Sequence, residues 1–418
     1  MYQEKLKIDW WTVGLWAFLV IFGWVNIYAA TYNGDHASVF DFSTFHGKQL
    51  IWIVAAAVMA MVVMFTEPRF FSNTAYIIYG AVLVLLVVTL FIAVTSHGGK
   101  SWIDLGIFRL QPSEFAKFAT ALALAKYMSA IDVDWKKTPT KVMALAIMGI
   151  PAILVFLQHD TGSALVFVAF VLPLFREGLS GLILVIGVAA IALFVLALLV
   201  NKYILLGVLV LLAVAYLFLW LNKRSSRDWW RVAAVLVCSA VFIFSVDFMF
   251  NHVLESHQRE RIDVLLGKTE DLQGSGYNVY QSKIAIGSGG FFGKGFLHGT
   301  VTKADFVPEQ HTDFIFCTVG EEWGWLGSSL LVAAYVWLLV RLVGMAERQR
   351  SRFARFYGYS VASVLFVHLF VNVGMVLGLV PVIGIPLPFF SYGGSSLLAF
   401  TILLFIFIRQ DATKNQLL

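Results

Sequence analysis

Charged side chains are scarce in this sequence, and their scarcity excludes an ordinary soluble domain. Only 13% of the 418 residues are Asp, Glu, Lys or Arg, whereas 60% are hydrophobic and the mean hydropathy is +0.82. Soluble globular domains carry about 25% charged residues. A helix needs roughly 20 apolar residues to cross a bilayer core, so this composition suffices for roughly a dozen spans. We therefore expect an all-α polytopic protein embedded in a lipid bilayer.

Cysteine and the common cofactor motifs are also lacking. The two cysteines, Cys238 and Cys317, lie inside apolar runs, which predicts buried thiols and excludes a disulfide framework. The sequence contains no Cys/His cluster with metal-ligand spacing and no nucleotide-binding glycine motif. We therefore expect no cofactor and no nucleic-acid partner. A divalent cation could assist the chemistry considered below, although the sequence shows no set of ligands for one.

The sequence instead contains long apolar runs separated by short loops. Hydropathy delimits twelve runs. They lie near residues 13–30, 49–65, 71–95, 114–131, 141–158, 161–176, 178–199, 203–222, 229–250, 311–340, 357–380 and 388–408. The whole chain, 1–418, is predicted to form a single membrane domain, with no internal repeat and no soluble domain at either end.

Basic residues gather in alternate loops and at both ends of the chain. They are Lys136, Lys137 and Lys141 after the fourth run, Lys223, Arg224, Arg227 and Arg231 after the eighth, Arg341, Arg348, Arg350, Arg352 and Arg355 after the tenth, and Lys5, Lys7, Arg409 and Lys414 near the termini. If twelve spans alternate in direction, all of these fall on one side, which the positive-inside rule assigns to the cytoplasm. Both termini are therefore predicted to be cytoplasmic.

One loop on the other side, about 251–309, is far longer than the rest and rich in glycine. Loops of this length are usually functional, and the glycines predict tight turns and close backbone approach. Near its start, Arg259 and Arg261 suit either a phosphate ligand or the role of interfacial anchors. Residues 281–290 are predicted to form a short interfacial helix that presents Lys283 as a further phosphate ligand.

The stretch 308–316 ends this loop and contains the main catalytic candidate, Asp313. Pro308 suits the first turn of a helix, so Glu309 and Asp313 are predicted to share a helix face. An aspartate at the start of a membrane helix is costly and usually functional. The alternative is an acid that only anchors the helix end. Glu309 and His311 are candidate substrate contacts in the same stretch.

Glu114 and Lys117 form a second candidate site. Ser113 is predicted to cap the helix that begins here, and the i,i+3 spacing puts both charges on one face. At a membrane helix start, such a pair faces an internal cavity or a head group, and Lys117 would suit an anionic pyrophosphate. The alternative is a purely structural ion pair.

The remaining polar positions favour structural roles. Asp160, in a short outer loop, is most simply a helix cap, although it is also a candidate substrate contact. Glu321 and Glu322 follow Asp313 about 12 Å deeper along the predicted helix, so paired or protonated structural carboxyls are expected. The segment 381–388, with three prolines, is predicted to be extended or re-entrant.

Together these stretches resemble a known family. Residues 99–106, 111–117, 281–299, 308–316 and 384–396 are similar to motifs of the SEDS proteins (shape, elongation, division and sporulation), bacterial membrane glycosyltransferases that polymerise lipid II into peptidoglycan. The resemblance covers nearly the whole chain and follows the elongation branch of the family. It implies that Asp313 is the general base and that Glu114 and Lys117 line a central cavity. It also implies an active site facing outward from the bacterial plasma membrane, a class B penicillin-binding protein as partner, and the rod-shape machinery around both.

The chain departs from the family pattern at three places. His159 stands where a proline is usual, and Val301 replaces a common glutamine. Members of the family usually have ten spans, so residues 178–222 are predicted to be an inserted helix pair, which leaves the topology of later spans unchanged.

The resemblance implies an inverting displacement in which Asp313 takes the proton of a sugar hydroxyl, while Lys117, Arg259, Arg261 and Lys283 face the departing pyrophosphate. Two alternatives use the same residues: a lipid II flippase, and a non-enzymatic scaffold for the penicillin-binding protein. Glycines and basic residues cluster on the outer side, which favours the enzyme, because a transporter needs polar groups reachable from both sides.

Overall fold

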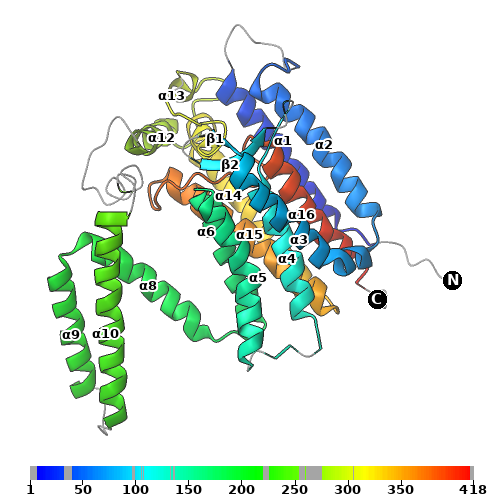
Figure 1. Cartoon of the computed structure of the whole chain (residues 1–418). Helices are drawn as coiled ribbons and strands as arrows, with labels where there is room; N and C mark the ends of the chain where they lie inside the picture. The colour runs from blue at the N-terminus through cyan, green and yellow to red at the C-terminus, as the bar shows by residue number, and fades with distance from the viewer. Residues whose placement is uncertain are drawn as a thin grey trace. The chain divides into compact units, whose positions relative to one another are not determined.

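The fold is helical, as the sequence predicts. The computed structural model describes residues 7–32, 40–96, 99–104, 106, 108–131, 133–134, 137–219, 226–253, 259, 275–304 and 306–414. The long helices are α1 (Trp10–Thr31), α2 (Phe45–Phe65), α3 (Pro68–Ile92), α4 (Pro112–Met128), α5 (Thr138–Leu157), α8 (Gly181–Leu199), α9 (Lys202–Leu219), α10 (Ser226–Phe248), α14 (Ile315–Glu347), α15 (Arg352–Val376) and α16 (Gly394–Ala412) (Figure 1). The shorter ones are α6 (Thr161–Val166), η1 (Phe167–Phe170), α7 (Val171–Arg176), η2 (Met249–Val253), α12 (Ser275–Gly289) and α13 (Thr300–Lys303).

Nine helices in the described part of the chain are long and apolar enough to cross a membrane. Two further apolar helices, Thr161–Arg176 and Lys202–Phe218, are shorter, and α4 has 17 residues. Each of the twelve predicted apolar runs overlaps one of these helices. The prediction of an all-α polytopic membrane protein is therefore confirmed.

A small antiparallel sheet lies between α3 and α4, and the apolar runs did not predict it. Its strands β1 (Val94–Ser96), β2 (Gly99–Asp104) and β3 (Arg109–Leu110) pair in the order β1-β2-β3. The hydroxyl of Ser395 donates to the carbonyl of Arg109 and accepts from the amide of Gln111, each at 3.2 Å. The sheet and the start of α4 are thereby held against the start of α16.

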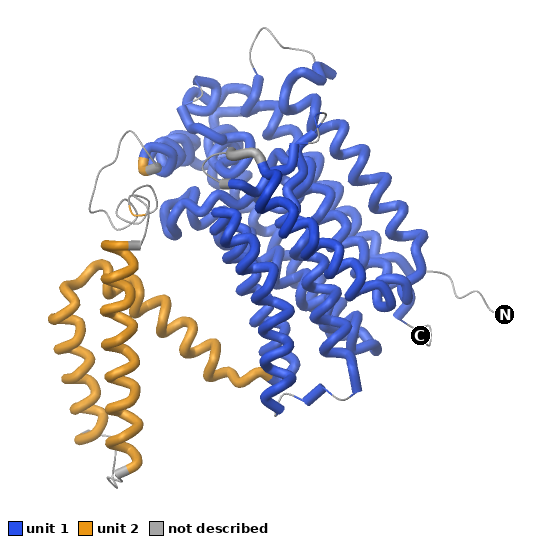
Figure 2. Tube along the Cα trace, viewed as in Figure 1, with its two compact units in different colours: residues 1–178, 277–418 blue, residues 179–276 orange. Residues whose placement is uncertain are grey.

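The chain divides into two compact units, coloured in Figure 2: residues 1–178 with 277–418, and residues 179–276. In the first unit α4 packs against both α15 and α16. In α15 and α16, 78% of the apolar window is buried, compared with 22% in α2 and 17% in α3. The three helices α4, α15 and α16 therefore form the core of this unit, and the outer helices present their apolar surface to lipid.

The second unit contains α8, α9 and α10. Lys202 at the start of α9 pairs with Asp247 near the end of α10 at 2.8 Å. Cys238 on α10 is exposed, so the prediction of a buried thiol is wrong there, whereas Cys317 is buried. An apolar run in a membrane span is covered by lipid as readily as by protein, so hydropathy alone does not locate a thiol in a protein core. The prediction that 178–222 is an inserted pair concerns α8 and α9 and stays a prediction.

Candidate functional site

Asp313 lies in a turn that precedes α14. Residues 308–314 form turns, and α14 begins only at Ile315. The prediction that Pro308 sits in the first turn of a helix, with Glu309 and Asp313 on one helix face, is therefore wrong. The reason is the backbone of Glu309, whose φ of 58° is left-handed and incompatible with a continuing right-handed helix. Its carbonyl accepts from the amide of Thr312 at 3.1 Å, which closes a tight turn.

The Asp313 side chain is half-buried beside segment 381–387, which forms neither helix nor strand. A Cβ added at Gly384 would stand 3.2 Å from Oδ2 of Asp313, so this glycine leaves room for the carboxylate. The side-chain amide of Asn372, on α15, donates to the carbonyls of Asp313 and Ile385 at 2.8 Å each. Residues 381–387 form neither helix nor strand, so the predicted non-helical backbone of this segment is confirmed, whereas its being re-entrant or extended stays a prediction. The side-chain amide of Asn372 holds this backbone and that of Asp313 together.

His311 lies on the same turn and belongs to an aromatic cluster with Phe45 and Tyr392. Its ring stacks on Phe45 with centroids 4.2 Å apart and lies 5.6 Å from the Tyr392 ring. Its carbonyl accepts from the amide of Tyr392 at 2.9 Å. Burial raises the pKa of Tyr392, so its hydroxyl stays neutral at physiological pH. The neighbouring Gln310 is buried and donates to the carbonyls of Ala30 and Thr302.

Glu114 and Lys117 form the predicted ion pair, with Nζ 2.6 Å from Oε1 and both side chains only 1% exposed. The prediction that Ser113 caps α4 is wrong, since Gln111 is the N-cap and Pro112 occupies the first helical position. Proline is suited to that position because its missing N–H has no acceptor in the first turn. Ser113 instead donates to Asp160 Oδ2 at 3.2 Å.

The ammonium of Lys117 has a second partner, which the sequence analysis missed. It lies 3.0 Å from Nε2 of His368, and Nδ1 of the same ring lies 3.0 Å from the carbonyl of Pro386. A carbonyl only accepts, so the network assigns the proton to Nδ1 and leaves Nε2 to accept from Lys117. Asn372 was missed as well. The signal for both was present in the sequence, as two polar residues four apart inside an apolar run.

Asp160 caps a helix, as its loop position predicted. Its Oδ1 accepts from the amide of Ser163 at 3.0 Å at the start of α6, and its Oδ2 accepts from Gln111 Nε2 at 2.9 Å. The carboxylate thus ties the start of α4 to the start of α6. Its role as a substrate contact stays a prediction.

The glycine-rich loop is held against α14 by backbone contacts. A Cβ at Gly289 would overlap the carbonyl oxygen of Gly320, and one at Gly293 would overlap that of Glu322. Just after these contacts α14 is kinked at Gly324, where φ is 64° and ψ is −161°. The predicted close backbone approach of the loop glycines is confirmed at Gly289 and Gly293.

The basic candidates of the long loop belong to different parts of the chain: Lys283 to the first unit and Arg259 to the second. Lys283 is exposed on α12, in the predicted short helix, and its side chain packs over Gly378. Arg259 belongs to the second unit, where it donates to the carbonyl of Asn251 at 2.8 Å and lies over the ring of Phe250. Arg261 lies outside the described residues. The phosphate contacts of all three stay predictions.

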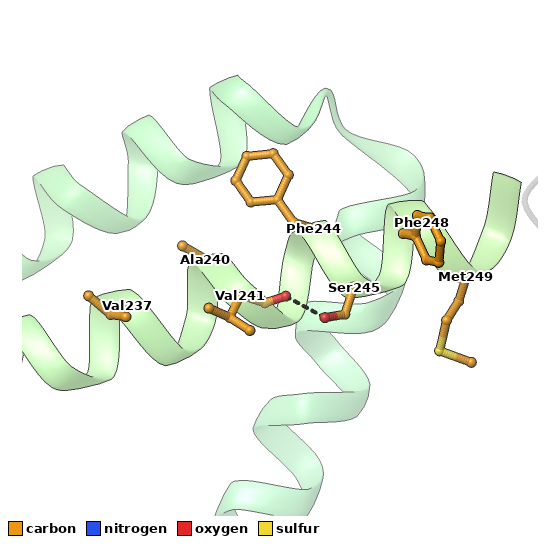
Figure 3. A pocket seen from close by; sticks show the side chains of 7 residues that line it. All are labelled: Val237, Ala240, Val241, Phe244, Ser245, Phe248 and Met249. Carbon is orange, nitrogen blue, oxygen red and sulfur yellow. Dashed lines mark hydrogen bonds between the residues drawn. The ribbon is translucent and has the colours of Figure 1, made fainter. Parts of the chain in front are cut away.

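A hollow on α10 contains none of the predicted site residues (Figure 3). Its lining comes from α10 and the first residue of η2: Val237, Ala240, Val241, Phe244, Ser245, Phe248 and Met249. The hydroxyl of Ser245 donates to the carbonyl of Val241 at 2.7 Å and is thereby satisfied within its own helix. The hollow therefore directs no polar group toward a ligand. Among the described residues, no group of three or more His, Cys, Asp or Glu is arranged to hold a metal ion.

The chain matches the family model FTSW_RODA_SPOVE, described as cell cycle protein, over residues 9–212 and 184–416. The peptidoglycan glycosyltransferase MrdB of Escherichia coli (strain K12) is 36% identical over 352 residues, which are 84% of this chain and 80% of that protein. The peptidoglycan glycosyltransferase RodA of Treponema pallidum (strain Nichols) is 29% identical over 376 residues, which are 84% of this chain and 86% of that protein.

Two solved structures share the fold. A chain from work on the structural coordination of polymerization and crosslinking by a peptidoglycan synthase complex superposes with a TM-score of 0.71 at 26% identity, covering 98% of this chain and 99% of that one. The rod shape determining protein RodA of Thermus thermophilus superposes with a TM-score of 0.61 at 25% identity, with the same coverage. Both superpositions cover 98% of this chain, and the residues matched by the family model include Asp313 and Lys117.

Proposed function

Because the chain belongs to the FtsW/RodA/SpoVE family, whose model matches residues 9–212 and 184–416, we propose that it is a peptidoglycan glycosyltransferase. It polymerises lipid II into β-1,4-linked glycan strands during cell elongation and maintenance of rod shape. The peptidoglycan glycosyltransferase relative that is 36% identical over 84% of this chain supports the reaction class. The relation to rod shape determining proteins supports the assignment to elongation.

In the proposed reaction Asp313 accepts the proton of the 4-hydroxyl of an acceptor GlcNAc. That oxygen forms a bond to C1 of a donor MurNAc while the bond from C1 to the pyrophosphate oxygen breaks, so undecaprenyl pyrophosphate leaves with inversion. The observation that carries this role is the half-buried carboxylate of Asp313, held on a turn with space at Gly384 and its backbone fixed by Asn372. A positioned base of this kind typically increases the reaction rate by about 10²- to 10⁴-fold.

The leaving group needs cations. Lys283 is the exposed candidate on α12 and is available to a lipid pyrophosphate. Lys117 is neutralised by Glu114 inside the core, so it would act on substrate only through a change in that pair. The proposed phosphate-binding role of Arg259 and Arg261 is supported only by their chemistry, because paired guanidinium groups match the geometry of a phosphate. Asp160, Glu309 and His311 complete the proposed set of substrate contacts.

We further propose that the protein is a multi-pass protein of the bacterial plasma membrane, with both termini cytoplasmic and Asp313 facing outward. The distribution of Lys and Arg among the loops supports this orientation. A class B penicillin-binding protein, within the rod-shape machinery, is the proposed partner. The similarity to a chain of a peptidoglycan synthase complex that couples polymerization to crosslinking supports it.

The test is polymerisation of lipid II by the purified protein in the presence of moenomycin. Strand synthesis that is lost in Asp313→Ala supports the proposal. Movement of lipid II across vesicle membranes without any strand synthesis would identify a flippase instead. Growth of a deletion strain rescued fully by Asp313→Ala would identify a scaffold.

A further inference from the structure

Helix α15 carries two buried polar side chains on one face, His368 and Asn372, both 0% exposed. Four residues rise about 6 Å along a helix and stay on the same side. Both side chains bond to groups outside their own helix. Ser360, also buried on α15, differs because its hydroxyl donates at 2.9 Å to the carbonyl of Phe356 in the same helix.

The two side chains hold consecutive carbonyls of segment 381–387. Asn372 donates to Ile385 at 2.8 Å, and His368 lies 3.0 Å from the carbonyl of Pro386. The remaining bond of each reaches a candidate site group: Asn372 donates to the carbonyl of Asp313, and His368 accepts from Lys117. The face of α15 therefore joins two sites that are distant in sequence.

Two acceptor atoms of this network lack a hydrogen-bond partner among the described residues. Glu114 Oε2 and Asn372 Oδ1 are both buried without a hydrogen-bond partner in the part of the chain that the structure describes. Buried polar atoms are paired in the great majority of cases, and exceptions mark strain or function. One of these two acceptors lies beside each candidate site group.

We propose that His368 and Asn372 are positioning residues that fix the Asp313 turn relative to the Glu114–Lys117 pair, with carbonyls 385 and 386 as their common support. This inference rests on the proposed glycosyl transfer and deepens it. The reaction needs its base and its charged groups at a set separation, since a misplacement of about 1 Å costs on the order of a hundredfold in rate. Asn372 sets the backbone from which the carboxylate projects, and His368 sets the direction of the Lys117 ammonium.

The two ring nitrogens of His368 are separable by substitution. In His368→Asn the amide replaces Nδ1, which keeps the bond to Pro386 and removes the acceptor for Lys117. In His368→Gln the longer side chain replaces Nε2, which keeps the acceptor for Lys117 and releases Pro386. Asn372→Leu removes both bonds of Asn372, and Asn372→Ala does so with less bulk. Ser360→Ala is the matched control on the same helix.

Two measurements on the purified full chain test the proposal. Asn372→Leu and His368→Asn are expected to lower kcat for lipid II polymerisation by about 10- to 100-fold, with KM changed by less than about twofold because the ground-state contacts remain. His368→Gln should recover part of the loss, because it restores the acceptor for Lys117 but not the bond to Pro386, and Ser360→Ala should show no loss. Hydrogen–deuterium exchange in peptides over 309–316 and 383–392 should rise in Asn372→Leu and stay unchanged in Ser360→Ala.

The outcomes separate this inference from the proposed function. If the wild-type protein polymerises and the folded Asn372 and His368 variants keep kcat within about twofold, the positioning role is wrong. A lowered melting temperature with unchanged kcat per folded molecule would equally overturn it. If the wild-type protein makes no strands, the proposed function fails, and exchange alone decides: faster exchange in both peptides supports positioning, and unchanged exchange refutes it. Asn372→Ala replaces Asn372→Leu if the latter does not fold.

Discussion

Lys294 and Glu321 form an ion pair of 2.7 Å that ties the glycine-rich loop to α14 ahead of its kink. The Glu321 side chain is 0% exposed, whereas that of Lys294 is 25% exposed. The same carboxylate accepts from the backbone amides of Thr300, Val301 and Thr302 at 2.7 to 2.9 Å. It therefore fixes the start of α13, and the expectation that Glu321 is a paired structural carboxyl is confirmed.

Glu321→Ala is expected to lower the free energy of unfolding by about 3–5 kcal/mol, because it leaves an ammonium and three backbone amides without their acceptor. Thermal denaturation in detergent measures the loss. Glu347→Ala is the matched control, since Glu347 pairs with Arg176 on an exposed part of the surface. Equal losses in both variants would show that the buried pair contributes no more than the exposed one.

Gly289→Ala and Gly287→Ala test the contact between α12 and α14. A Cβ at position 289 would overlap the carbonyl of Gly320, whereas one at position 287 meets nothing within 4 Å. Gly289→Ala is expected to destabilise the protein by about 1–3 kcal/mol through overpacking. Gly287→Ala should be neutral or stabilising by up to about 1 kcal/mol, because alanine favours the helix. A neutral Gly289→Ala would contradict the close packing of this loop on α14.

The pH dependence of stability should report the pair between Asp9 and Arg341, whose guanidinium lies 2.6 Å from the carboxylate. Burial opposes ionisation of Asp9, but the hydrogen bonds and charge of Arg341 outweigh it and hold the pKa of Asp9 below its ordinary value. A lowered folded-state pKa stabilises the protein above the unfolded pKa of about 4, and the contribution is lost as the pH falls through the folded value.

Asp9→Asn should therefore melt at a lower temperature than wild type at pH 7, and the difference should shrink as the pH falls below about 4. The comparison is made by thermal denaturation in one detergent across that pH range. A difference that stays constant or grows toward acid pH would show that ionised Asp9 does not stabilise the fold.

Hydropathy located the helices because the bilayer requires long apolar segments and tolerates few charges in them. It did not locate the turn before α14, because the left-handed backbone of Glu309 depends on the tertiary contacts that hold the turn. The pairing of Glu114 with Lys117 followed from their spacing. The role of His368 could not be predicted in this way, because its partners Lys117 and Pro386 are far from it in the sequence and meet it only in the folded chain.

The most direct measurement of the central claim is kcat for lipid II polymerisation by Asp313→Asn at saturating substrate, with wild type and Asp104→Asn measured alongside. Asp104 is a matched control because it is a partly exposed aspartate, paired with Arg109 on the small sheet. If Asp313 is the general base, kcat in Asp313→Asn falls by about 10²- to 10⁴-fold while the melting temperature stays near that of wild type. Asp104→Asn should retain wild-type kcat. An Asp313→Asn enzyme that folds and polymerises within about tenfold of wild type would contradict the assignment.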